Sequence, residues 1–191
     1  MGFATVAIYA SMIVWILPLF RQYKTRLFYY FLILGLADPV AIVFFYLFNI
    51  DTLFIHSIVG ILLFYFVDFE RKTILKNRVI NLVIIAGFIT ALFTLSNLIL
   101  LIIICHFLIL LKFIKHIIIG LYEQGEVNTF YLILVFYELT ILVNLIAIIG
   151  KTDLGYLLHY LTVLFDVLVA VFFTILRSDS KRLVFSLKPV T

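Results

Sequence analysis

Long apolar segments separated by short charged clusters dominate this sequence of 191 residues. Apolar residues make up 66% of the chain and charged residues only 13%, whereas a soluble domain carries about 25% charged residues. The chain therefore cannot cover a water-facing surface, which excludes a soluble globular enzyme, a disordered chain and a disulfide scaffold. The apolar segments are continuous and do not alternate with polar residues, so a membrane β-barrel is excluded too. We expect an all-α, polytopic membrane protein.

The lengths of the apolar segments predict seven membrane-spanning helices. A helix needs about 20 residues to cross a hydrocarbon core of about 30 Å. The stretch from Val79 to Leu111 contains no Asp, Glu, Lys or Arg and is too long for one span. We divide it at Ser96 and Asn97, because these residues favour turns. The predicted spans are 3–20, 27–48, 52–67, 79–95, 98–116, 128–149 and 156–176.

The basic residues indicate how these spans are oriented. Cytoplasmic loops of membrane proteins are enriched in Lys and Arg, and with the N-terminus outside, every Lys and Arg except Lys151 falls on the cytoplasmic side. A single span in place of the fourth and fifth would invert the later loops. We therefore expect a seven-transmembrane-helix bundle over residues 1–176 in a cytoplasmic-type membrane, with the N-terminus outside. A short basic cytoplasmic tail follows over 177–191, and its charge suits anionic lipid headgroups.

Three acidic residues lie at the centres of predicted spans. Asp38, Glu138 and Asp166 occupy the midpoints of the second, sixth and seventh spans, and His106 is close to the centre of the fifth. A charged side chain at that depth costs about 2.5–3.5 kcal/mol, and no Lys or Arg lies there to pair with it. We expect these carboxyls to face the interior of the bundle and to bind a cation, a proton or a small polar solute, for transport or sensing.

The seventh span has a polar face, because its polar and small residues recur every three or four positions. These residues are His159, Thr162, Asp166 and Ala170. The candidate ligand-binding or ion-binding residues are therefore Asp38, His106, Glu138, Asp166, His159 and Thr162. His56 is expected at the membrane interface, and most of the 21 Phe and 11 Tyr are expected to face lipid or the interface. No His or Cys spacing typical of a metal site occurs, so we expect no metal, no cofactor and no catalytic residue.

Two other functions are compatible with the same carboxyls. In a non-catalytic subunit or scaffold of a larger membrane complex, protonated carboxyls would only hold helices together, as Thr140 and Asn144 also could. In an intramembrane hydrolase, two aspartates sharing a proton would activate a water molecule. The net charge is only +4 and the bases lie between apolar segments, so we expect no nucleic-acid partner. The expected partners are the lipid bilayer, a small solute or cation, and other membrane proteins.

Two segments resemble the motifs of the two-aspartate intramembrane hydrolases. Gly35-Leu36-Ala37-Asp38 is similar to their GxGD signature, and Phe165-Asp166 is similar to its YD partner. Both segments depart from the pattern, and their order along the chain is reversed relative to the presenilin type. The resemblance implies an aspartate pair at Asp38 and Asp166.

Two further resemblances are shorter. Residues 17–25 resemble the first motif of the PQ-loop and SWEET transporters, with Pro18 before a basic loop, although Leu19 replaces their Gln and the fifth span lacks the second Pro. Residues 165–171 resemble the seventh helix of microbial rhodopsins. Ala170 stands at the position of their retinal lysine, which excludes a Schiff base. None of these resemblances establishes membership of a family.

Overall fold

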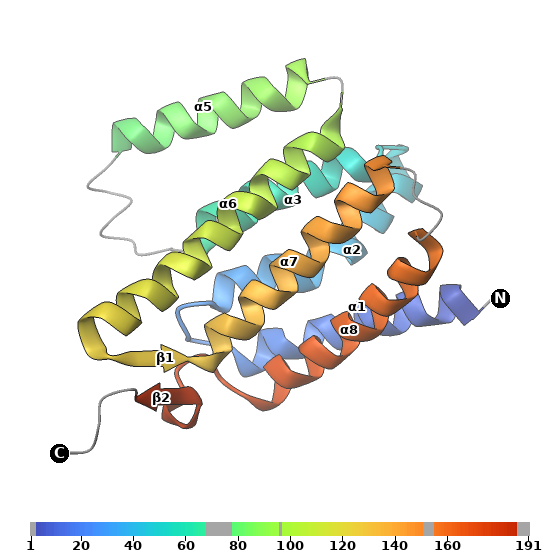
Figure 1. The fold of residues 1–191 in the computed structure, drawn as a ribbon. Coiled ribbons are helices and arrows are strands. Elements are labelled where there is room, and N and C mark those ends of the chain that lie inside the picture. Colours follow the sequence, from blue (N-terminus) through green and yellow to red (C-terminus); the bar gives the residue numbers. More distant parts are fainter. Residues whose placement is uncertain (1–2, 68–77, 96, 151–154, 187–191) are drawn as a thin grey trace.

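The structure is a computed structural model that describes residues 3–67, 78–95, 97–150 and 155–186. Seven α-helices account for most of these residues (Figure 1). They are α1 (Phe3–Arg21), α2 (Phe28–Phe48), α3 (Thr52–Phe66), α5 (Arg78–Thr94), α6 (Leu98–Ile119), α7 (Thr129–Gly150) and α8 (Gly155–Ile175). The predicted all-α fold is confirmed, and each helix matches a predicted span to within a few residues.

Short polar residues set several helix ends. The side chains of Asp51 and Asn97 cap α3 and α6, where each accepts a hydrogen bond from the backbone N–H two residues later, at 2.9 and 3.1 Å. Asn49 ends α2 in the left-handed conformation, with a φ of 52°. Ser96, which was predicted to turn the chain together with Asn97, lies outside the described residues.

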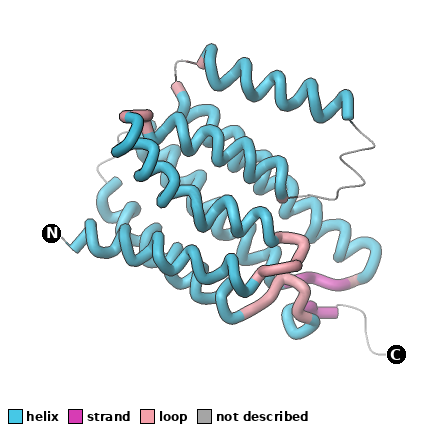
Figure 2. The backbone as a smooth tube through the Cα atoms, turned by 180° about the vertical axis from the view of Figure 1, so that it is seen from behind, coloured by secondary structure: helices cyan, strands magenta, loops and turns pink. Residues whose placement is uncertain are grey.

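Six of the helices form a closed ring. Helix α1 packs against α2 and α8, α3 packs against α2 and α6, and α7 packs against α6 and α8. Helix α5 lies outside this ring, beside α3 and α6, as both views of the backbone show (Figures 1 and 2). Phe88 of α5 contacts Phe64 of α3, with ring centroids 5.6 Å apart. The ring encloses the interior in which buried side chains meet.

The two ends of the ring differ in charge. We name them the Asp51 end, where residues 49–51 join α2 to α3, and the Gln22 end, where residues 22–27 join α1 to α2. Every described Lys and Arg lies in the half of the bundle toward the Gln22 end. The described residues of the Asp51 half therefore carry acidic and neutral side chains only.

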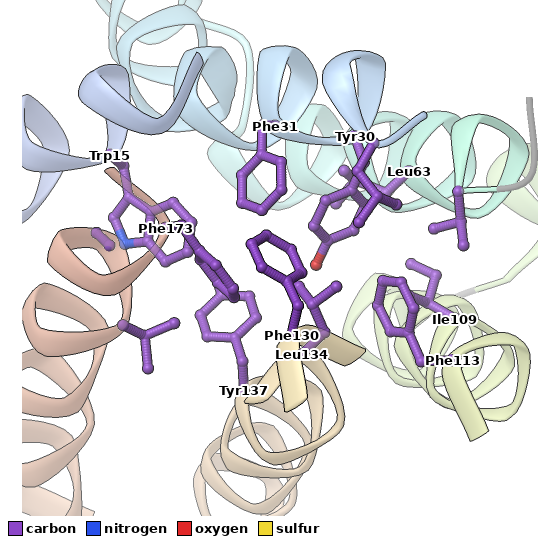
Figure 3. Packing of buried hydrophobic residues seen from close by; sticks show 14 of the residues in the cluster. Trp15, Tyr30, Phe31, Leu63, Ile109, Phe113, Phe130, Leu134, Tyr137 and Phe173 are labelled. Carbon is purple, nitrogen blue, oxygen red and sulfur yellow. The ribbon is translucent and has the colours of Figure 1, made fainter. Parts of the chain in front are cut away.

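An aromatic cluster fills the ring interior toward the Gln22 end (Figure 3). Phe173 of α8 lies between Phe31 of α2 and Phe130 of α7, at centroid distances of 4.9 and 4.8 Å. All three rings are completely buried, and tilted contacts of this kind are the arrangements that aromatic rings prefer. Part of the Phe and Tyr content that was expected to face lipid thus forms the core.

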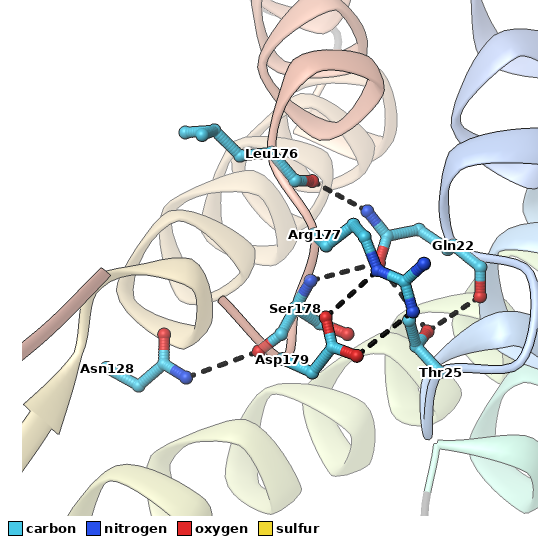
Figure 4. Close-up of polar contacts among 7 residues, drawn as sticks. All are labelled: Gln22, Thr25, Asn128, Leu176, Arg177, Ser178 and Asp179. Carbon is cyan, nitrogen blue, oxygen red and sulfur yellow. Dashed lines mark hydrogen bonds and ion pairs between the residues drawn. The ribbon is translucent and has the colours of Figure 1, made fainter. Parts of the chain in front are cut away.

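A polar network ties the end of α8 to the turn after α1 (Figure 4). The buried Gln22 side chain donates to the carbonyl oxygens of Phe173 and Leu176, at 2.9 and 2.7 Å. Its Oε1 accepts a hydrogen bond from the backbone N–H of Ser178 at 3.0 Å. Gln22 therefore satisfies one carbonyl in the last turn of α8 and one directly after it, where carbonyls have no partner within the helix.

Secondary structure continues past the predicted end of the fifth span at residue 116 and into the predicted tail over 177–191. Helix α6 continues through 117–119, because the isoleucines there do not break a helix, and a π-helical turn follows at Gly120–Gln124. Strand β1 (Glu126–Asn128) pairs antiparallel with β2 (Val184–Ser186), after a short 3-10 helix at Lys181–Leu183. The first part of the tail therefore folds back onto the end of the bundle.

The crossing of α1 and α2 generates a testable prediction. A Cβ atom added to Gly35 would lie 2.7 Å from the backbone oxygen of Trp15, whereas a Cβ on Gly87 of α5 would meet nothing within 4 Å. We expect Gly35→Ala to destabilise the protein by about 1–3 kcal/mol, the usual cost of overpacking. Gly87→Ala should leave stability unchanged or raise it by about 0.5–1 kcal/mol, because Ala favours helix over Gly. Thermal unfolding in detergent measures both variants, and equal stability would contradict the close crossing.

Candidate functional site

A cavity of about 430 Å³ lies inside the ring, between the aromatic cluster and the Asp51 end. All six ring helices contribute to its wall, and the lining extends to Leu53 near the start of α3 and Leu145 in the last two turns of α7. Its polar lining residues are Ser11, Asp38, His56, His106, Asn144 and Asp166, together with the partly polar Trp15 and Tyr137. The described lining contains no Lys or Arg.

Asp38 and His56 form the exposed rim of the cavity. The Asp38 side chain of α2 is 55% exposed and the His56 side chain of α3 is 34% exposed. His56 Nε2 lies 3.8 Å from Asp38 Oδ1, so a protonated His56 would form an ion pair with Asp38. The two residues come from helices joined by the 49–51 turn, which places them side by side.

A hydrogen-bonded triad forms the floor. Glu138 of α7 is completely buried, and the hydroxyl of Tyr30 donates to its Oε1 at 2.6 Å. His106 Nδ1 and Glu138 Oε2 share a second hydrogen bond of 2.7 Å. Both carboxyl oxygens thus have a partner, which offsets the cost of removing them from water.

The triad fixes the orientation of His106. Because Nδ1 is engaged by Glu138, Nε2 is the ring nitrogen left for a ligand, and His106 is part of the cavity wall. A carboxylate bonded to one imidazole nitrogen holds the ring in place and strengthens the other nitrogen as a ligand or proton acceptor. His106 therefore contributes an imidazole ring of fixed orientation to the cavity wall.

Asp166 of α8 differs from Glu138 because part of its carboxyl group has no partner. Its Oδ1 atom is buried and makes no hydrogen bond in the described structure. Asp38 lines the same cavity. Two carboxylates in one cavity repel each other unless a proton or a cation lies between them. An unsatisfied acidic oxygen in the cavity wall is what a cationic or protonated ligand would complete.

The cavity also has an aromatic wall. The rings of Trp15 and Tyr137 lie 4.9 Å apart, and both residues line the cavity. The faces of such rings attract cations. Among the residues that the structure describes, no three His, Cys, Asp or Glu side chains are grouped closely enough to hold a metal ion.

The structure brings together four of the six candidate residues. Asp38, His106 and Asp166 line the cavity, and Glu138 lies directly behind His106. Thr162, one turn from Asp166, is buried but is not part of the lining. The side chain of His159 lies outside the described residues.

Sequence reasoning missed two members of this arrangement. His56 was expected at the interface, but it lies beside Asp38 at the rim. Tyr30 was not considered, and its contact with Glu138 joins residues 108 positions apart. Asp38 and His56 lie at unequal distances from the turn at residues 49–51, so their spacing does not indicate the first contact, and no local pattern indicates the second.

Comparison with known proteins identifies no relative. No protein-family model matches the sequence, and neither the curated proteins nor the solved structures contain a significant match.

The triad predicts a strong dependence of stability on Glu138. Glu138→Ala leaves His106 and Tyr30 without their buried partner, so we expect a loss of about 3–5 kcal/mol. Tyr30→Phe removes one hydrogen bond and should cost about 1–2 kcal/mol. Thr140→Val is the matched control on α7, because the Thr140 hydroxyl bonds only to the Phe136 carbonyl of its own helix. Thermal unfolding in detergent compares the three, and a Glu138 variant as stable as the Thr140 variant would refute the triad.

Proposed function

We propose that the chain is a seven-span membrane protein, with the N-terminus outside and the C-terminus in the cytoplasm. Three described helices, Phe28–Phe48, Leu98–Gln124 and Thr129–Gly150, are long and apolar enough to cross a membrane. Large apolar residues are exposed along the outer faces of all seven helices, including Ile13, Leu47 and Phe93, which exceeds what a water-soluble monomer exposes. The placement of Lys and Arg at the Gln22 end supports an orientation with that end in the cytoplasm.

Within this bundle, the cavity is proposed to bind a small cationic or proton-bearing solute. The observation that carries the proposal is the buried, unpartnered Oδ1 of Asp166 in a cavity shared with Asp38 and lined by no described Lys or Arg. Because the buried Oδ1 of Asp166 has no partner in the described structure, a mobile cation or proton can complete it. Trp15 and Tyr137 add aromatic surface that suits an organic cation.

The size of the cavity narrows the class of ligand. Its volume of about 430 Å³ falls in the range of about 300–1,000 Å³ typical of small-molecule sites. A bare alkali ion would leave most of that space to water, at about 30 Å³ per molecule. A small organic amine, or a hydrated cation, fits the volume and the charge together.

In this proposal the exposed Asp38 and His56 form the entrance to the cavity, and the aromatic cluster closes it toward the Gln22 end. A sensor needs only this state and a conformational change when the ligand binds. A transporter needs a second state in which the aromatic cluster separates and the rim closes, as in alternating access. Both uses begin with the same binding step, so binding is the property to test first.

Asp166→Asn and Asp38→Asn test the proposal in proteoliposomes with a series of alkylammonium ions, Na⁺, K⁺ and a pH-sensitive dye. We expect each variant to weaken cation binding or flux by about tenfold or more, as for loss of a charge-assisted contact. Asp166→Asn should keep full thermal stability, because it removes an unpartnered acid. Asp51→Asn is the matched control: it removes an acid at the same end outside the cavity lining, and Asn is an equally good helix cap.

Other outcomes distinguish the alternatives. Loss of stability in the Asp166 variant, with no cation bound by the original protein, would favour a scaffold in which the acids join helices. Hydrolysis of lipid or peptide that either aspartate variant abolishes would favour the two-aspartate hydrolase, for which the shared cavity of Asp38 and Asp166 is the supporting observation. Equal cation binding by all the variants would reject the proposed site.

A further inference from the structure

A second cavity lies at the Gln22 end, between the end of α1 and the segment that follows α8. Its volume is about 380 Å³. Three arginines, Arg21, Arg177 and Arg182, contribute to its wall. The other lining residues are Ile175, Leu176, Asp179 and Ser180. This cavity is separate from the acidic one and shares no lining residue with it.

Two of the arginines have guanidinium N–H groups to offer a ligand. Arg21 Nε donates to the Ile175 carbonyl oxygen at 3.2 Å, which positions the side chain and leaves its terminal N–H groups for other acceptors. Arg182 is exposed and makes no hydrogen bond or ion pair with another described residue. A guanidinium presents its N–H groups in a planar fork that matches phosphate oxygens.

The third arginine is held by an internal carboxylate. Arg177 donates to both carboxyl oxygens of Asp179, each at 3.0 Å (Figure 4). This hydrogen bonding, with the nearby positive charge, lowers the pKa of Asp179 below its usual value, so the carboxylate stays charged at neutral pH. Asp179 therefore occupies the Arg177 fork in the way that a phosphate group would.

We infer that this arginine pocket binds a phosphate group, either on the headgroup of an anionic phospholipid or as free phosphate, with Asp179 as an internal competitor. Arg21 and Arg182 make the first contacts, and Arg177 joins them when it leaves Asp179. The inference does not depend on the proposed cation site, and only its lipid source rests on the proposed membrane orientation.

Exposed apolar side chains lie in and beside the arginine pocket. Ile175, in its wall, is 62% exposed, and Phe20, next to Arg21 on α1, is 72% exposed. A lipid with its headgroup among the arginines would have apolar side chains beside its acyl chains. Basic pockets between helices at the cytoplasmic side are recurring sites for anionic headgroups.

Charge variants of the full chain in an uncharged detergent test the inference. Native mass spectrometry with phosphatidylglycerol measures lipid binding, phosphatidylcholine is the zwitterionic comparison, and calorimetry with inorganic phosphate measures the free ion. We expect Arg182→Gln to weaken binding by about tenfold, the factor for one charge-assisted hydrogen bond. Asp179→Asn should tighten binding, because it frees Arg177. Lys115→Gln is the control, since it removes an exposed charge from the same end outside this pocket.

The binding results distinguish a phospholipid headgroup from free phosphate as the ligand. Binding of phosphatidylglycerol but not of inorganic phosphate assigns the pocket to a lipid headgroup, and binding of inorganic phosphate assigns it to the free ion as well. Failure of both probes to bind, or an equal loss in the Arg182 and Lys115 variants, would overturn the inference in favour of diffuse surface charge. If Arg182→Gln did not fold, Asp179→Asn would still decide, because unchanged affinity in that variant contradicts competition for Arg177.

Discussion

Glu138 is completely enclosed by protein, and its hydrogen bonds to Tyr30 and His106 make that burial possible. In an apolar bundle, an acidic group without partners would be forced to neutralise or to find a ligand. The three residues come from α2, α6 and α7, so the triad also fixes how these helices face one another. Asp166 lies in the same interior without such a pair of partners, and this contrast separates the structural acid from the proposed binding acid.

The interior of the ring is divided into two halves with different chemistry. Toward the Gln22 end, aromatic rings from α2, α7 and α8 contact one another and fill the interior. Toward the Asp51 end, the same helices carry Asp38, Asn144 and Asp166 around a cavity. The triad lies at the boundary. In the proposed function, a ligand that passes the exposed Asp38 and His56 meets acidic groups first, then the oriented imidazole of His106, and then the aromatic cluster.

The helices could be predicted from the sequence, because long uncharged segments with polar ends leave few alternatives. The π-helical turn after α6 and the short 3-10 helix at Lys181–Leu183 were missed. Solvation cost predicted that the acids face inward, and Glu138 is completely buried, whereas the Asp38 side chain is 55% exposed. The sequence did not indicate which acid is structural and which is the proposed binding acid, because that depends on which helices are neighbours in the ring. Tyr30 and Glu138 are distant in sequence, and a tyrosine near a helix start is typical of a membrane interface as well as of a core. The pairing of β1 with β2 was missed for the same reason.

If the bundle spans a membrane as proposed, water reaches the cavity only from the side of the Asp51 end, and single-cysteine labelling in a membrane measures this. In a Cys105→Ala background, Asn144→Cys reports on the cavity, and Tyr122→Cys, at a position that is 90% exposed, reports on the Gln22 end. We expect a membrane-impermeant thiol reagent to modify position 144 from the side opposite to that which modifies position 122, and an excess of a cation bound by the cavity to slow the reaction at 144. Protection of position 144 from both sides, or modification from the same side as position 122, would rule out a cavity that opens at the Asp51 end.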